Sequence, residues 1–305
     1  MTQNTANRPL ASAFCMLFAM SIIGGIDNLI VILAQDIGLW QFHFFRALMA
    51  VPLVIALPLL GLGTLWPLRT WAVALRSGFV GISMLLYFSS LALMPIAQAL
   101  AGLFTSPIFI LLIKWLYYRE PIQSVRIVAV ILGFSGILMV LRPDAESLTW
   151  LTLLPVAAGF FYALGALATR SLCVGESTVA LLAGMWVMLG LMGAAGLVLL
   201  TILPENNISG ADGFVSRGWI WPLSQSIILI MIQAVFSVIG VFFIIKSYQI
   251  GDVSHASIFE YSVMIFGPFY AYLIFDQTLT ILQIIGIGFI IIAGTVLAFG
   301  IRLKG

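Results

Sequence analysis

Charged residues are scarce in this chain of 305 residues, because Asp, Glu, Lys and Arg make up only 8% of it. A soluble domain carries about 25% of such residues, so the composition excludes an ordinary soluble protein. Hydrophobic residues reach 62% and occur in long runs. Since a helix needs about 20 apolar residues to cross a bilayer, the sequence predicts an integral membrane protein that works through its transmembrane helices.

Cysteine and histidine are almost absent, with two residues of each. Cys15 and Cys173 lie in or beside apolar runs without metal-type spacing, so neither a disulfide framework nor a zinc site is expected. No metal or other cofactor is predicted. The net charge of +2 is explained by membrane orientation and not by nucleic-acid binding. A removable signal peptide is not expected, because no small-residue cleavage site follows the first apolar run.

Clusters of Pro, Gly, Asn and charged residues divide the chain into ten apolar stretches of about membrane-crossing length. Only one linker, 204–222, is longer than a dozen residues, so no separate soluble domain is expected. The predicted fold class is an all-α polytopic membrane protein with ten transmembrane helices. These cover residues 11–34, 41–60, 71–93, 96–117, 125–141, 148–170, 178–203, 223–248, 253–275 and 279–302.

The orientation follows from the Lys and Arg residues, which concentrate on the cytoplasmic side of membrane proteins. With a cytoplasmic N-terminus, ten of the 13 lie inside, Arg76 and Lys114 among them. Arg46, Arg142 and Arg217 are the exceptions. We expect a multi-pass protein of the inner (cytoplasmic) membrane with both termini in the cytoplasm.

An internal repeat relates the two halves of the chain. A shift of 157 positions aligns segment 93–120 with segment 250–277 and pairs Phe104 with Tyr261. Each half would contain five helices, an odd number, so the halves would have opposite orientations in the membrane. The sequence therefore predicts a 5+5 inverted-topology repeat, with the two units at residues 1–145 and 146–305.

With these features the chain resembles the EamA-type carriers of the drug/metabolite transporter superfamily. The resemblance also rests on FFRALMAVPLV at residues 44–54 and on the repeated segment, which ends in Glu120 in its first copy. The second copy ends in Asp276-Gln277, where the family usually has Gly-Glu. The resemblance implies a secondary transporter that moves amino acids or other small metabolites across the cytoplasmic membrane, often outward.

Two prolines interrupt the fourth and ninth predicted helices. Pro107 and Pro268 lie about one turn apart in the repeat alignment. Proline removes a backbone hydrogen bond, and in a membrane the freed carbonyl must be satisfied by protein, water or ligand. Paired interrupted helices point to the binding site of a carrier, although a simple packing kink is the alternative at each proline.

Glu260 is the most unusual residue in the predicted helices. It is expected about 10 Å from the inner end of its helix, which is too deep for its short side chain to reach the interface. An acidic residue near mid-membrane costs roughly 3 kcal/mol on insertion scales, so it usually faces a cavity or a partner. We predict that Glu260 binds substrate or carries a proton, and a static hydrogen-bonded acid is the alternative.

Asp27 and Arg46 are predicted at similar depths in the outer parts of the first two helices. We expect an ion pair between them, as either a fixed bridge or a gate that opens during transport. His43 lies one turn from Arg46 and is placed to tune it, although a water-exposed histidine is the simpler expectation. Lys114 is expected to extend along its helix to the interface.

Aromatic and small polar residues indicate a mostly apolar cavity for a small amphiphile, such as an amino acid or a related amine. We expect the protein to act in the bilayer as a monomer or weak homodimer, and its acidic residues allow proton coupling. The wall candidates are Tyr87, Phe104, Trp186, Phe259, Tyr261, Ser83 and Ser257.

Other functional classes compete with this prediction. Residues 133–136 spell the GxSG of intramembrane serine proteases, but both histidines are expected near membrane boundaries, away from such a serine. A channel is disfavoured because no ring of like charges or polar filter sequence is visible. The sequence predicts an alternating-access carrier rather than an enzyme. Export is the favoured direction, and uptake or facilitated passage of another metabolite is the alternative.

Overall fold

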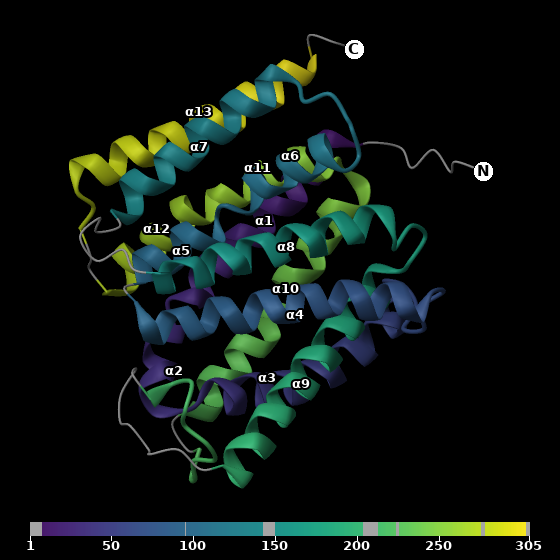
Figure 1. Cartoon of the computed structure of the whole chain (residues 1–305), viewed down its shortest axis with the longest axis vertical. Helices are drawn as coiled ribbons and strands as arrows, with labels where there is room; N and C mark the ends of the chain where they lie inside the picture. The colour runs from purple at the N-terminus through teal and green to yellow at the C-terminus, as the bar shows by residue number, and fades with distance from the viewer. Residues whose placement is uncertain are drawn as a thin grey trace.

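The computed structural model describes residues 8–94, 96–142, 150–203, 213–223, 226–275 and 278–302, and the regular structure in these ranges is helical (Figure 1). The α-helices are α1 (Pro9–Asp27), α2 (Ile30–Asp36), α3 (Leu39–Ala56), α4 (Thr70–Leu93), α5 (Ile96–Leu103), α6 (Ser106–Leu116), α7 (Ser124–Leu141), α8 (Leu153–Ser171), α9 (Thr178–Ile202), α10 (Ser226–Ile250), α11 (Val253–Phe259), α12 (Val263–Phe275) and α13 (Ile281–Arg302). Short 3-10 helices are η1 (Leu57–Leu60), η2 (Trp150–Thr152) and η4 (Glu260–Ser262).

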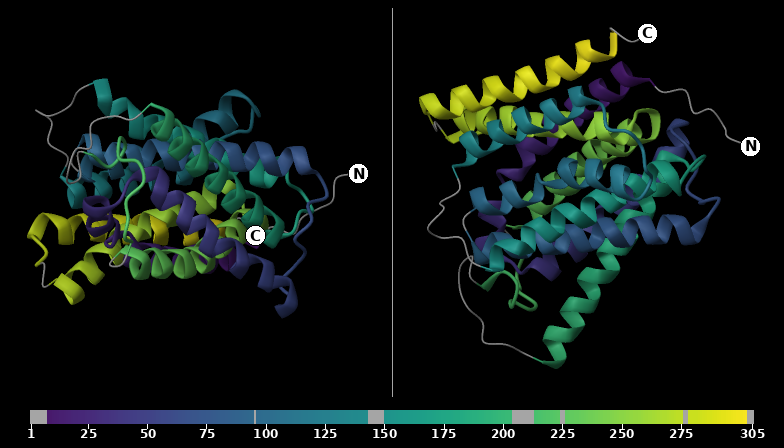
Figure 2. Two further views of the ribbon diagram at one scale, coloured as in Figure 1. Left: turned by 90° about the horizontal axis from the view of Figure 1, so that it is seen from below. Right: turned by 45° about the horizontal axis from the view of Figure 1, so that its top comes forward.

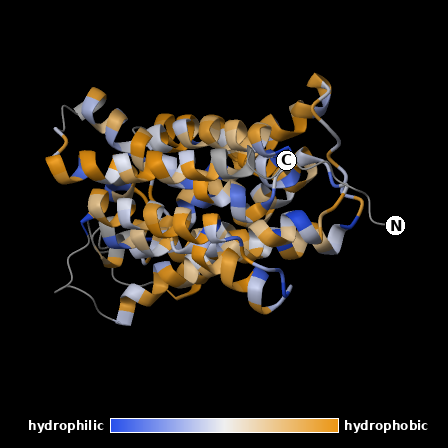
Figure 3. Cartoon of the chain, turned by 90° about the horizontal axis from the view of Figure 1, so that it is seen from above, coloured by the Kyte–Doolittle hydropathy of each residue, from blue (hydrophilic) through white to orange (hydrophobic). Residues whose placement is uncertain are grey.

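The described residues contain eight helical segments long and apolar enough to cross a membrane, and a shorter apolar helix at Ile281–Leu297. Hydrophobic residues predominate along the helices (Figure 3), and many large apolar side chains lie on the surface, such as Phe14 at 70% and Ile131 at 60% exposed. Such a surface suits lipid contact, so the chain is a multi-pass membrane protein. The count of ten spans and the inverted repeat stay predictions.

The helices pack side by side in one bundle, as two further views also show (Figure 2). Helix α7 packs along α13 at one edge, α3 packs along α9 at the other, and the pairs α1 with α10 and α4 with α8 lie between them (Figure 1). The start of α1 and the end of α13 lie at the same end of the bundle (Figure 1). The centre of the bundle is thus enclosed by helices from both parts of the chain.

Three of the predicted spans are interrupted within the bundle. Helix α1 gives way to α2 after Asp27, α5 to α6 at residues 104–105, and α11 to α12 at η4. Pro107 lies in the first turn of α6, where its missing N–H group does no harm. Helix α12 continues through Pro268, so the interruption in the last segment lies at η4 and not at this proline.

Side chains satisfy the carbonyl groups that these interruptions release. At the end of α1, the Gln233 side chain donates a hydrogen bond of 2.6 Å to the Ile26 carbonyl. Thr105 Oγ1 donates to the Gly102 carbonyl, and Ser262 Oγ donates to the Phe259 carbonyl, both at 2.6 Å. The interruptions are therefore built into the sequence as stable features of the buried backbone.

Glycine allows very close packing between α7, α13 and η4. A Cβ atom on Gly136 would lie 2.6 Å from the Gly286 carbonyl oxygen, and one on Gly286 would lie 2.7 Å from the Gly136 carbonyl oxygen. A Cβ atom on Gly133 would lie 2.3 Å from the Tyr261 ring. Both glycines of the GxSG sequence are thus explained by helix packing, without a protease role.

An ionic cluster joins α6, α7 and the start of α11. Lys114 Nζ lies 2.8 Å from a Glu120 oxygen and 2.9 Å from Asp252 Oδ2, while Arg126 Nη1 lies 3.1 Å from Asp252 Oδ1. Lys114 is 9% exposed and is held in this cluster, while its partner Glu120 has a side chain that is 52% exposed. Burial raises the pKa of Asp252, but Arg126, Lys114 and the hydrogen bond from Ser254 outweigh it and hold that pKa well below its usual range.

Candidate functional site

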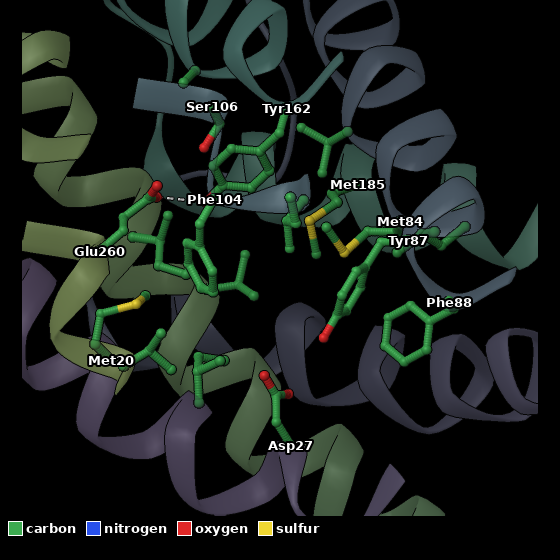
Figure 4. Close-up of a pocket in the computed structure, with 18 of the residues that line it drawn as sticks. Met20, Asp27, Met84, Tyr87, Phe88, Phe104, Ser106, Tyr162, Met185 and Glu260 are labelled. Carbon is green, nitrogen blue, oxygen red and sulfur yellow. Dashed lines mark hydrogen bonds between the residues drawn. The ribbon is translucent and has the colours of Figure 1, made fainter. Parts of the chain in front are cut away.

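A central cavity of about 140 Å³ lies among α1, α3, α4, α5, α6, α8, α9, α10, η4 and α12. Methionine and aromatic side chains form much of its wall, and polar side chains reach it from several helices (Figure 4). The labelled residues include Met20, Met84, Met185, Phe88 and Phe104 (Figure 4). An apolar cavity with a few polar groups inside a membrane bundle is the usual form of a small-molecule site.

Glu260 lies at the start of η4, is 2% exposed and lines the cavity. Its Oε1 accepts a hydrogen bond of 2.6 Å from the Tyr162 hydroxyl and one of 2.7 Å from the Tyr248 hydroxyl. Within the described part of the chain it forms no salt bridge. Two phenol donors stabilise a carboxylate that has no cationic partner.

Neither tyrosine was predicted from the sequence as a site residue. Tyr162 lies within α8 and Tyr248 within α10, and both line the cavity. The sequence shows only that each tyrosine places a hydroxyl group inside, or at the end of, a long apolar run. Sequence spacing does not show which of several tyrosines turns toward Glu260, because the helices come from distant parts of the chain.

Arg76, which was predicted only to lie on the cytoplasmic side, is a residue of the cavity wall. It is 4% exposed within α4. Its Nε donates to Thr169 Oγ1 at 3.1 Å and its Nη1 donates to the Leu181 carbonyl at 3.3 Å. These contacts tie α4 to α8 and α9 and leave a cationic side chain at the cavity wall.

Asp27 and Arg46 both line the cavity, but the expected ion pair is absent between these two described side chains. Arg46 donates to the Ser237 hydroxyl instead. Its guanidinium carbon lies 5.3 Å from the Phe42 ring centroid and 5.1 Å from that of Trp186. Asp27 and Arg46 therefore share the cavity wall, but Ser237 and two aromatic rings hold the Arg46 guanidinium group in place of a direct ion pair.

His43 is fully buried, contrary to the expectation of a water-exposed histidine. Its ring meets the Phe88 ring nearly at right angles, with the centroids 5.0 Å apart. Neither ring nitrogen has a hydrogen-bond partner among the described residues. His43 does not line the cavity, so it can affect the shape of the cavity only through its packing against Phe88.

The remaining predicted residues divide between the cavity wall and the surrounding core. Tyr87, Phe104 and Trp186 line the cavity. Ser83 donates a hydrogen bond of 2.8 Å to the Ala158 carbonyl and joins α4 to α8. The described residues contain no cluster of His, Cys, Asp or Glu able to hold a metal ion. Outside the wall lie Ser257, Phe259, Tyr261, Pro107 and Pro268, and Asp276 and Gln277 lie outside the described residues.

The curated relatives are transporters. A riboflavin transporter of Vibrio cholerae is 28% identical over 276 residues, covering 88% of this chain and 86% of that protein. A riboflavin transporter of Brucella anthropi is 29% identical over 227 residues, covering 73% of each. An S-adenosylmethionine uptake transporter of Rickettsia conorii is 22% identical over 242 residues, covering 79% of this chain and 75% of that protein.

A solved crystal structure shares the fold, with a TM-score of 0.74 over 96% of this chain and 99% of that one at 16% identity. The sequence profile of the EamA-like transporter family matches residues 10–142 and, a second time, residues 149–299. Together these two matches cover most of the sequence and the helices around the cavity. The chain therefore belongs to the EamA-like transporter family and is a membrane transporter.

Proposed function

We propose that this protein is a secondary transporter that takes up a flat aromatic metabolite by alternating access, with riboflavin as the preferred substrate. The observation that carries the proposal is the central cavity, whose methionine and aromatic wall has polar groups at both ends. Three relatives named riboflavin transporters support the substrate. Uptake is preferred to the export expected from sequence, because several relatives are named uptake transporters.

Alternating access requires two states of similar energy, and an inverted repeat provides them. If the halves are inverted copies, helix α1 is equivalent to α8, α3 to α9, α4 to α10 and α7 to α13. The packing of α1 on α10 is then equivalent to the packing of α8 on α4. In the other two packed pairs, α3 with α9 and α7 with α13, each helix packs against its own equivalent in the other half. This exchange of packing pairs, together with the two matches to the family profile, supports the proposed repeat.

The interrupted segments agree with the same alignment. Thr105 and Ser262 are equivalent under the shift of 157 positions, and so are Gly102 and Phe259. Thr105 bonds to the Gly102 carbonyl, and Ser262 bonds to the Phe259 carbonyl. The same local hydrogen bond therefore stabilises the same interruption in each half, which supports a substrate site between paired broken helices.

S-adenosylmethionine is the second candidate, because relatives carry that name and two carboxylates, Asp27 and Glu260, line the cavity. Its sulfonium and ammonium groups would be attracted by these carboxylates and by the aromatic faces nearby. The amino acids and amines expected from sequence form a third group. The cavity also contains Arg46 and Arg76, so its formal charges balance, which favours a neutral molecule such as riboflavin.

Uptake into proteoliposomes made with the purified protein tests the proposal. Riboflavin, S-adenosylmethionine, amino acids and quaternary amines would be supplied outside, with protein-free vesicles as the control. We expect saturable uptake of riboflavin that excess unlabelled riboflavin competes away. Saturable uptake of another compound with no effect of riboflavin would overturn the substrate, and a non-saturating conductance would indicate a pore instead of a carrier.

A further inference from the structure

A second cavity, of about 440 Å³, is enclosed by the connection between η1 and α4, the end of α8, the connection between α8 and α9, and the end of α10. The Arg8 N–H group donates to the Ile250 carbonyl at 2.9 Å, so the end of α10 lies beside the start of α1. Leu68 and Lys246 on the wall are exposed, and this cavity therefore opens to the surface at that end of the bundle. Its polar wall residues include Thr169, Arg170, Glu176, Thr178, Lys246 and Gln249.

The second cavity and the central cavity follow one another along the same helix faces. On α8, Tyr162 and Ala166 line the central cavity, and Thr169 lines the second cavity. Spacings of four and three residues place these side chains on one face of the helix. On α9, Met185 lines the central cavity, and Thr178, seven residues earlier on the same face, lines the second cavity. The two cavities are therefore neighbours, separated by about one helical turn along α8.

Arg76 lies at the boundary between the two cavities. It lines the central cavity from α4, and its Nε donates a hydrogen bond of 3.1 Å to Oγ1 of Thr169, which lines the second. Its Nη1 donates at 3.3 Å to the carbonyl of Leu181, which lies between Thr178 and Met185 on α9. Arg76 and Thr169 are 4% and 1% exposed. One hydrogen-bonded contact thus joins the wall of one cavity to the wall of the other.

Gln249 forms a second set of bonds in the same region. It lines the second cavity, directly after Tyr248 of the central cavity wall. Its side-chain oxygen accepts a hydrogen bond of 2.6 Å from the Thr178 hydroxyl, and its side-chain nitrogen donates at 2.8 Å to the Glu176 carbonyl. Arg170 Nη1 donates to the backbone carbonyl of Gln249. These bonds join the end of α10 to α8 and to the start of α9.

The oxygens that accept bonds from Arg76 and Arg170 are uncharged, because they belong to a hydroxyl and to backbone carbonyls. Such bonds can be exchanged for bonds to water at a small net cost, and the second cavity is polar and open at the surface. Charged contacts of Asp252 with Lys114 and Arg126 instead hold α6, α7 and the start of α11 together. The helices that can separate most readily here are therefore α4, α8, α9 and α10.

We propose, on the basis of transport by alternating access, that the second cavity is the passage between the central site and the membrane surface, and that Arg76 is its gate. The bonds from Arg76 to α8 and α9 close the passage in the state described above. When they break, substrate moves along the face of α8 from Tyr162 past Thr169. In the expected orientation this end faces the cytoplasm, so an uptake carrier releases its substrate here. The polar wall offers hydrogen bonds to the hydroxyl groups of a ribityl chain.

Cysteine labelling tests the gate without any substrate. Cys15 and Cys173, the two cysteines of the chain, are replaced by alanine, and Ala166→Cys then places a thiol on the wall of the central cavity. A small membrane-impermeant methanethiosulfonate is added to vesicles whose outer face labels Thr64→Cys, because Thr64 lines the second cavity. Thr169→Val removes the acceptor of Arg76 Nε with little change in shape. We expect Ala166→Cys to react about threefold to tenfold faster when Thr169→Val is also present.

Thr201→Val is the matched control for this substitution. Thr201 donates to the Leu197 carbonyl at 2.7 Å, as Thr169 donates to the Gly165 carbonyl at 2.8 Å, but Thr201 lines neither cavity. We expect Thr201→Val to leave the labelling rate unchanged, and Thr169→Ser, which keeps the hydroxyl group, to retain slow labelling.

An unchanged rate in Thr169→Val, or an equal increase in Thr201→Val, would overturn the gate, provided that size-exclusion profiles show the variants equally folded. Access to Ala166→Cys only from the opposite face of the membrane would overturn the passage. Because the labelling needs no riboflavin, these results are independent of the substrate. Absence of riboflavin transport would overturn the proposed function, and the labelling rates would still decide the passage.

Discussion

The rings of Phe104 and Tyr261 meet edge to face, with their centroids 6.3 Å apart and their planes at 78°. Each residue lies at the interruption of a broken helical segment, and the two are equivalent in the alignment of 93–120 with 250–277. Equivalent positions of two inverted halves meet only near the axis that relates them. Because Phe104 also lines the cavity, the proposed axis passes beside the candidate site.

Replacement of Glu260 by glutamine is expected to lower riboflavin flux about tenfold or more and to leave folding and membrane insertion unchanged. Glutamine has the same size and still accepts a hydrogen bond from Tyr162 or Tyr248, but it carries no charge and exchanges no proton. Flux into proteoliposomes from pH 5.5 to 8, with size-exclusion profiles of both proteins, checks this. Normal transport by Glu260→Gln across that range would make Glu260 a structural residue.

Removal of either phenol hydroxyl beside Glu260 should have a smaller effect than removal of the charge. We expect Tyr162→Phe and Tyr248→Phe each to reduce flux about threefold to tenfold, since one hydrogen bond to the carboxylate is lost and the other remains. Tyr118→Phe is the control, because its hydroxyl bonds to Ser171 outside the cavity. Equal flux in all three variants would argue against a role for the tyrosine pair.

The contact between α7 and α13 gives a paired stability test. Gly286→Ala would bring a methyl group 2.7 Å from the Gly136 carbonyl oxygen, whereas Gly288→Ala meets nothing within 4 Å. We expect Gly286→Ala to lose about 1–3 kcal/mol of stability through overpacking. Thermal unfolding of the purified proteins measures the difference. Equal unfolding temperatures for the two variants would show that the helices are not so closely packed.

The ionic cluster predicts a pH-dependent effect on stability. Asp252→Asn leaves Arg126 without its carboxylate partner and Lys114 with Glu120 alone, and we expect unfolding roughly 2–5 °C lower at pH 7. Folding lowers the pKa of Asp252, so its contribution is present at neutral pH and fades as the pH falls below about 3.9, the ordinary value for aspartate. The gap between wild type and variant should therefore be constant from pH 8 to 5 and narrow only in stronger acid. A gap that widened in acid would contradict the cluster.

Membrane orientation is testable with two exposed threonines at opposite ends of the bundle. Thr64 lies between η1 and α4, and Thr278 lies just before α13. After Cys15 and Cys173 are replaced by alanine, a membrane-impermeant maleimide is expected to label Thr278→Cys and not Thr64→Cys in intact cells. The reverse labelling pattern would place the termini outside.

The extent of each helix could be predicted from the sequence where hydropathy and a capping residue agree. Residues 178–203 were expected as a span, and α9 runs Thr178–Ile202 because Ser177 caps its first turn with a hydrogen bond from the Val179 N–H. The interruption at η4 was displaced in the prediction to Pro268. Hydropathy does not register a short 3-10 turn whose carbonyls are satisfied by side chains.

The contacts of the polar residues could not be predicted from the sequence. His43 was expected to be exposed to water, yet it is buried, and the sequence did not predict the contacts that bury Arg76 and Lys114. The partners of Glu260 were not predicted either. Hydropathy gives the depth of a residue in the membrane, but the rotation of each helix about its own axis decides whether a side chain meets lipid, protein or the cavity.

The central claim is that this protein is an alternating-access carrier for riboflavin, and counterflow tests it most directly. Proteoliposomes loaded with unlabelled riboflavin would be diluted into a trace of radiolabelled riboflavin. A carrier exchanges the two across its single site, so we predict transient accumulation of label above the outside concentration, absent from vesicles that contain the Glu260→Gln variant. Label that enters equally with and without internal riboflavin, and in proportion to its outside concentration, would contradict the account.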